Sequence, residues 1–80
     1  MFRVKASTQD PAIINVYNGR MDLFAVYGRS YDLQRVGLAA KIARAVDPDH
    51  WLLIYRNPKT PVREFETLEE LSAFLNRRYS

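Results

Sequence analysis

The sequence contains no cysteine, one histidine and three glycines among its 80 residues. Without cysteine the chain has no disulfide, no thiolate nucleophile and no cysteine-ligated zinc, a composition that fits a reducing compartment. No apolar run approaches the roughly 20 residues that a bilayer-spanning helix needs. The first residues alternate apolar and basic side chains and lack the continuous apolar core of a secretion signal. We therefore expect a cytoplasmic protein with no membrane segment.

The residues needed for catalysis are also scarce. The three glycines are too widely spaced to form a phosphate-binding loop, and no serine lies in a nucleophile-elbow setting. His50 lies beside Asp47 and Asp49, a set that could hold a metal ion. Two acids on either side of a proline are, however, ordinary turn residues, and a catalytic metal usually recruits a further ligand held by a strand or helix. We therefore expect no enzyme, no cofactor and no metal.

The composition, with 48% hydrophobic and 26% charged residues, is that of one globular domain covering residues 1–80. The net charge of +3 is unevenly distributed along the chain. Residues 1–46 carry seven basic and three acidic side chains, a balance of +4, whereas residues 47–80 carry five and six, a balance of −1. This excess is compatible with nucleic acid as a partner but does not require it.

Hydrophobic alternation and β-branched or aromatic enrichment mark the expected strands. The predicted strand Trp51–Tyr55 is apolar on both faces, as a central strand would be. Asn18-Gly19 separates the second and third strands and suits a type I′ hairpin turn. The five predicted strands are Phe2–Ala6, Ala12–Tyr17, Met21–Tyr27, Trp51–Tyr55 and Pro61–Glu66.

Two segments have helical periodicity. Tyr31–Val46 places small apolar residues on a broad arc, and Gly37 falls near its polar strip. This glycine either lets another backbone approach or occupies a tolerated surface position, and we favour the second explanation. The other helix begins at Thr67, where a capping box would pair the Thr67 hydroxyl with the Glu70 amide and the Glu70 carboxylate with the Thr67 amide.

The element order is thus strand-strand-strand-helix-strand-strand-helix. Hairpin connections favour antiparallel pairing. The sequence predicts an α+β, two-layer sandwich: a mainly antiparallel five-stranded sheet with two helices on one face and the other face free for a partner.

Two surfaces could bind that partner. Basic and aromatic side chains of the free sheet face could stack bases and neutralise phosphates, which makes a nucleic-acid-binding module the alternative function. Aromatic and arginine side chains also dominate protein interfaces, and an acidic group near the second helix could meet a basic protein surface. The expected partner-binding residues are Arg3, Lys5, Tyr17, Tyr55, Arg56, Glu64, Glu66, Glu69 and Glu70.

In its general build the chain resembles the anti-CRISPR proteins, small inhibitors encoded by phages and mobile elements. The likeness consists of the chain length, the lack of cysteine, the single α+β unit and the closing run from Glu64 to Leu71, which joins a strand, a cap and a helix. The resemblance implies an inhibitor in the host cytoplasm that occupies a CRISPR effector subunit and blocks target DNA binding or cleavage. The basic balance differs from that of acidic DNA mimics and favours occlusion of a protein surface.

Overall fold

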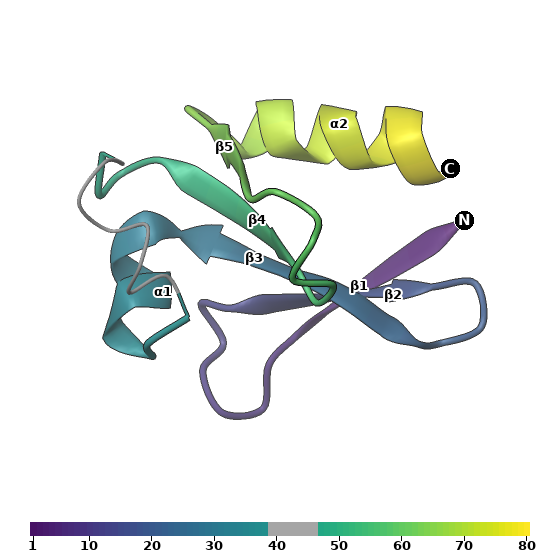
Figure 1. Ribbon diagram of the computed structural model, residues 1–80, viewed down its shortest axis with the longest axis horizontal. Coiled ribbons are helices and arrows are strands. Elements are labelled where there is room, and N and C mark those ends of the chain that lie inside the picture. Colours follow the sequence, from purple (N-terminus) through teal and green to yellow (C-terminus); the bar gives the residue numbers. More distant parts are fainter. Residues whose placement is uncertain (39–46) are drawn as a thin grey trace.

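The computed structural model describes residues 1–38 and 47–80, and its fold is α+β (Figure 1). Strands that are consecutive in the chain are also neighbours in the sheet, so no connection crosses over a strand. The elements are β1 (Phe2–Ala6), β2 (Ile14–Asn18), β3 (Leu23–Arg29), α1 (Ser30–Arg35), β4 (Trp51–Tyr55), β5 (Arg63–Phe65) and α2 (Leu68–Tyr79).

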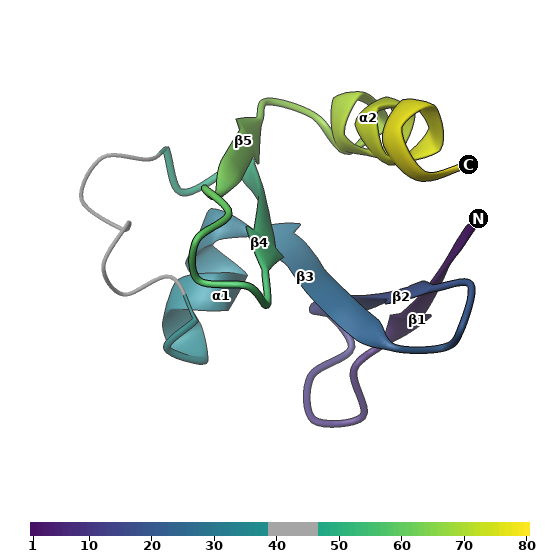
Figure 2. The same cartoon turned by 45° about the vertical axis from the view of Figure 1, so that its right-hand side comes forward.

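The five strands form one antiparallel sheet in the order β1-β2-β3-β4-β5, so every strand pairs with its neighbour in the chain. The predicted strand number, pairing direction and element order are confirmed. The bounds of β1 and β4 agree with the prediction, β2 and β3 each lie slightly later in the chain than expected, and β5 is shorter. The sheet is strongly twisted, which is seen best in Figure 2.

The β2–β3 hairpin is confirmed, but its turn differs from the expected type I′ pair. The Met21 amide donates to the Asn18 carbonyl at 3.0 Å, and the Asn18 amide donates to the Asp22 carbonyl at 2.9 Å. Met21 itself has a left-handed backbone with φ of 66°. This is a three-residue loop in which the residue after the turn takes the left-handed position, a role that the sequence gives to Met21 rather than Gly19.

Helix α1 ends much earlier than the periodicity of Tyr31–Val46 indicated. The Leu38 amide donates to the Leu33 carbonyl at 2.8 Å, and the Gly37 amide donates to the Gln34 carbonyl at 2.9 Å. Together with the φ of 81° at Gly37, these bonds form a Schellman motif that closes the helix after Arg35. Gly37 is therefore a C-cap residue, not a tolerated surface substitution, and residues 39–46 of the predicted helix lie outside the described residues.

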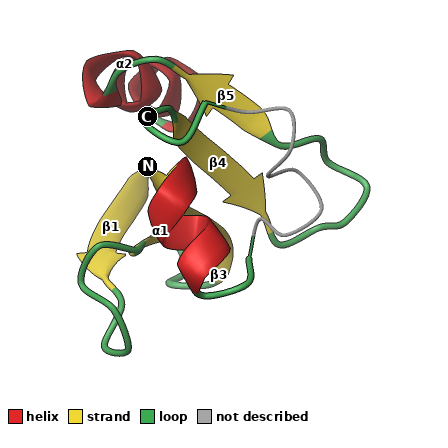
Figure 3. Ribbon diagram, turned by 90° about the vertical axis from the view of Figure 1, so that its left-hand side faces the viewer, coloured by secondary structure: helices red, strands yellow, loops and turns green. Residues whose placement is uncertain are grey.

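The two helices pack on opposite faces of the sheet, which differs from the expected arrangement. Leu53 of β4 belongs to a core cluster with Leu71 and Leu75 of α2, whereas its neighbour Leu52 packs with Leu33 of α1. Both leucines are 0% exposed. Successive strand residues point to opposite faces, so β4 is apolar on both sides because each side meets its own helix. Figure 1 shows α2 above the sheet and α1 below it, and Figure 3 shows α1 in front of the sheet.

Helix α1 is held close to the sheet by a glycine and by an ion pair. A Cβ atom on Gly28 of β3 would lie 3.2 Å from the Ala12 carbonyl oxygen and 3.6 Å from Leu33 Cγ, so a larger residue here would require its neighbours to shift slightly. Arg35 pairs with Asp10 at 2.8 Å, which ties the end of α1 to the β1–β2 loop. The face expected to be free is thus covered at its α1 end.

Helix α2 begins at the predicted cap. Thr67 Oγ1 accepts from the Glu70 amide at 3.2 Å, as expected, but the Glu70 carboxylate accepts from the Glu66 amide at 3.3 Å rather than from Thr67. In the described ranges, no helix is long and apolar enough to span a bilayer.

Candidate functional site

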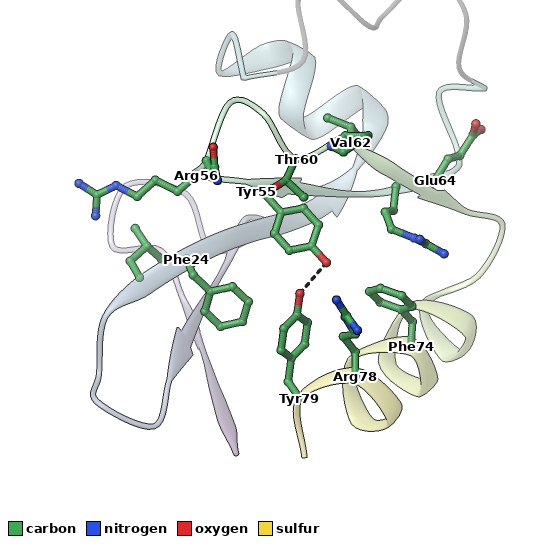
Figure 4. Close-up of a pocket in the computed structure, with 13 residues that line it drawn as sticks. Phe24, Tyr55, Arg56, Thr60, Val62, Glu64, Phe74, Arg78 and Tyr79 are labelled. Carbon is green, nitrogen blue, oxygen red and sulfur yellow. Dashed lines mark hydrogen bonds between the residues drawn. The ribbon is translucent and has the colours of Figure 1, made fainter.

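An open groove runs between the start of β3, the β4–β5 turn and the last two turns of α2 (Figure 4). We call it the arginine-aromatic groove. Its volume is about 1070 Å³. It is lined by Leu23, Phe24, Tyr55, Arg56, Asn57, Thr60, Pro61, Val62, Arg63, Glu64, Phe74, Arg78 and Tyr79.

Aromatic rings from three elements make up one wall of this groove. The Tyr79 hydroxyl of α2 forms a hydrogen bond with the Tyr55 hydroxyl of β4 at 2.8 Å. The Tyr79 ring lies 5.0 Å from the Phe24 ring of β3, centroid to centroid, in a tilted arrangement. All three residues are partly buried and pack against the core cluster, so the rings are held in place and remain partly accessible. Rigid aromatic side chains of this kind bind a partner with little loss of conformational entropy.

Two arginines lie against the aromatic wall. The Arg63 guanidinium lies 4.3 Å above the Phe74 ring, within range of a cation–π interaction. Figure 4 shows Arg78 between Phe74 and Tyr79, one turn of α2 beyond Phe74. With Arg56, the groove has three arginines and one glutamate, so the charge of its lining is positive.

The environment of Tyr55 differs from that of an exposed tyrosine. Burial of the phenol, followed by its hydrogen bond with Tyr79, raises the Tyr55 pKa from its ordinary value of 10.0 to about 12. Arg63 and Arg78 oppose this shift because their positive charges favour the phenolate. Tyr55 therefore stays a neutral hydrogen-bonding group at physiological pH.

Three of the residues expected to bind a partner meet in this groove: Tyr55, Arg56 and Glu64. Tyr55 forms the wall, whereas Arg56 and Glu64 lie at opposite ends and extend outward (Figure 4). The sequence alone does not show which face of β4 is buried, because both faces are apolar. Tyr55 faces α2, and its hydroxyl is already paired with Tyr79.

Arg3, Lys5 and Tyr17 form a separate surface on the other side of the sheet. Arg3 lies opposite Tyr17 in the β1–β2 ladder, and Val4, the residue between the two basic side chains, lies opposite the buried Val16 of the α2 face. By strand alternation Arg3 and Lys5 therefore point away from α2. Arg3 and Lys5 are exposed and Tyr17 is partly buried. The structure thus divides the expected basic and aromatic set between two surfaces.

The acidic residues surround His50. His50 Nδ1 hydrogen-bonds to Glu64 Oε2, and its Nε2 lies 4.0 Å from Asp47 Oδ2. The bond to Glu64 and the negative charges of Glu64, Asp47 and Glu66 raise the His50 pKa above 6.5. His50, Glu64, Glu66 and Glu70 line a smaller pocket of about 400 Å³, which leaves out Glu69. Across residues 1–38 and 47–80, no three His, Asp or Glu side chains are grouped to hold a metal ion.

Sequence reasoning missed five important groove residues: Phe24, Arg63, Phe74, Arg78 and Tyr79. From the sequence alone, Phe74 and Tyr79 have the spacing of the buried face of a helix, and Arg78 is a cation at the favourable end of the helix dipole. The spacing of Phe74 and Arg78 carried a usable signal, because residues four apart share one helix face.

Comparisons with protein-family models, curated proteins and solved structures found no match to this chain. The functional interpretation therefore depends on the residues of the two surfaces themselves.

Proposed function

We propose that this protein acts by binding a protein partner rather than by catalysis, and that the arginine-aromatic groove is its main contact surface. The observation that carries the proposal is the convergence of Arg63 and Arg78 with Tyr55, Tyr79 and Phe74 around one groove. Arginine and aromatic side chains are the residues most enriched at the energetic centres of protein interfaces. The positive charge favours a partner segment that carries carboxylates.

The biological role that we propose is inhibition of an anti-CRISPR type. Such an inhibitor would occupy a CRISPR effector subunit and block target DNA binding or cleavage. The basic groove supports occlusion of an acidic protein surface over imitation of DNA, because a DNA mimic needs dense negative charge. The resemblance in overall build supports the same proposal.

Single-stranded nucleic acid is the second candidate. The observation that favours it is the same mixture of side chains, since arginines neutralise phosphates and accessible rings stack bases. Arg3, Lys5 and Tyr17 add a second basic surface. The two candidates differ in whether the purified protein binds free nucleic acid.

Arg77 and Arg78 allow a matched test. They are adjacent in the last turn of α2, both are exposed, and only Arg78 lines the groove. Arg78→Glu and Arg77→Glu therefore change the net charge and the helix terminus in the same way. The readout is phage plaquing on bacteria whose CRISPR system targets that phage, tried across the effector types. We expect the unaltered chain and Arg77→Glu to restore plaquing and Arg78→Glu to lose this effect.

Fluorescence anisotropy with labelled single-stranded DNA and RNA tests the second candidate. A nucleic-acid-binding groove would bind at micromolar protein, weaken steeply between about 50 and 200 mM salt, and lose affinity in Arg78→Glu. We expect no such binding. Salt-sensitive binding together with unchanged plaquing would replace the inhibitor proposal with the nucleic-acid one.

A further inference from the structure

We propose that the outer edge of β1 is a docking site for an extended segment of a partner protein in which acidic and apolar residues alternate. We call this site the β1 edge (Phe2–Ala6). β1 is the first strand in the sheet order and pairs only with β2 in the part of the chain that the structure describes. The side of β1 opposite β2 thus presents backbone groups that an added strand could bind. This inference concerns a surface separate from the arginine-aromatic groove.

The side chains of the β1 edge divide by charge between the two faces of the sheet. Arg3 and Lys5 point to the face away from α2. On the α2 face, Val4 is 48% exposed, and Phe2 is partly buried against the core. An added strand would place its own residues alternately beside the two cations and beside these apolar groups, because same-face neighbours on adjacent strands lie about 5 Å apart. Acidic residues fit the first face and apolar residues the second.

The same charge pattern argues against pairing between two copies of β1. An antiparallel pair of two β1 strands centred on Val4 would place Arg3 opposite Lys5 of the other copy. A pair centred on Arg3 would place the two Arg3 side chains opposite each other, and a pair centred on Lys5 would do the same for Lys5. Like charges directly opposite one another destabilise an antiparallel pair. Pairing between the β1 edges of two copies is therefore disfavoured, whereas pairing with a strand of the opposite charge is not.

Glu64, Phe65 and Glu66 at the other end of the sheet have the complementary pattern, so a second copy could in principle supply the acidic strand. These residues are already engaged within their own chain, however. The Glu64 carboxylate binds His50, and the Glu66 amide donates to Glu70. We therefore assign the β1 edge to a different protein, and self-association is an outcome that the test must detect.

The test uses a short synthetic peptide of alternating glutamate and valine. Its controls are a peptide with lysine in place of glutamate, and the glutamate peptide N-methylated on every backbone amide, which keeps the charge but leaves neither edge of the peptide able to donate to a strand. Amide NMR and hydrogen exchange identify the residues that respond. We expect the glutamate peptide alone to shift the amide signals of β1 and to slow exchange there roughly tenfold at saturation.

Charge reversal keeps the test decisive. The double variant Arg3→Glu, Lys5→Glu should no longer bind the glutamate peptide and should bind the lysine peptide instead. Binding of the lysine peptide also shows that the variant is folded. Arg78→Glu should bind the glutamate peptide normally, so failure of the groove proposal would not be mistaken for failure of this one. The inference is overturned by an absence of binding, by equal binding of the N-methylated peptide, by indifference to charge reversal, or by self-association through β1 in sedimentation.

Discussion

The hydroxyl of Tyr79, one residue from the end of the chain, and the hydroxyl of Tyr55 in β4 share a hydrogen bond of 2.8 Å. This bond joins the last turn of α2 to the sheet and fixes the wall of the arginine-aromatic groove. Tyr79→Phe removes the Tyr79 hydroxyl and retains the ring against Phe24. We expect the free energy of unfolding, measured by urea denaturation, to fall by about 1 kcal/mol.

Loss of the same bond should be visible in the titration of Tyr55. Burial would still raise the Tyr55 pKa in Tyr79→Phe, but the pKa should fall below the value of about 12 because the second cause is removed. In the parent protein the folded pKa exceeds the unfolded one, so the stabilisation from Tyr55 is present below pH 10 and is lost as pH rises through about 12. Ultraviolet titration follows the ionisation of Tyr55, and Tyr31→Phe, which removes an exposed tyrosine instead, is the control. An unchanged Tyr55 titration in Tyr79→Phe would contradict the assignment.

Met21 occupies a backbone conformation that suits glycine, with φ of 66° and a side chain that is 56% exposed. Met21→Gly should raise the free energy of unfolding by about 0.5–1 kcal/mol, because relief of the left-handed strain exceeds the added entropy of the unfolded chain. Arg20→Gly adds the same entropy without relieving strain and should destabilise. Urea midpoints of the two variants should therefore move in opposite directions.

Gly37 provides the converse experiment. Among the described residues a Cβ atom at Gly37 would meet nothing within 4 Å, so Gly37→Ala tests the backbone preference at φ of 81°. We expect a loss of about 1 kcal/mol. Gly19→Ala is the matched control, since the φ of Gly19 is not positive and a Cβ there would lie 4.0 Å from the Met1 carbonyl oxygen. Equal effects of the two substitutions on thermal unfolding would count against the Schellman cap.

His50 should make stability depend on pH near neutrality. Its pKa is raised first by the hydrogen bond to Glu64, so the stabilisation is complete below pH 6.5 and is lost as pH rises through the higher folded value. His50 is the one histidine of the chain, so a single imidazole resonance reports the titration. Glu64→Gln should lower the His50 pKa, whereas Glu69→Gln, outside the small pocket, should leave it unchanged.

The sequence was sufficient for the strands and for the start of α2, because alternation along Phe2–Ala6 and the cap at Thr67 are local signals. It was insufficient for α1. Helical periodicity continues past Gly37 and masked the local stop signal, a glycine that takes a left-handed backbone and closes the helix. Apolar residues at both Leu52 and Leu53 indicated a buried strand but could not say which helix covers which face.

The candidate site was predicted only in part for a related reason. Tyr55 and Arg56 are adjacent in sequence and were identified, but the groove depends on their meeting Phe74 and Arg78 of α2. That meeting is a long-range contact, which periodicity and composition do not encode. The basic surface at Arg3 and Lys5 was identified because alternation within one strand defines it completely.

The uninterrupted strand order also determines how the chain can fold. Each strand pairs with the one synthesised immediately before it, and the ladders close short loops at small entropic cost except for β3–β4, whose connection covers residues 30–50. Chains dominated by such near-neighbour pairings reach the native state quickly. The contact between Tyr79 and Phe24 spans most of the sequence, so we expect α2 to dock after the sheet has formed and the groove to be completed late in folding.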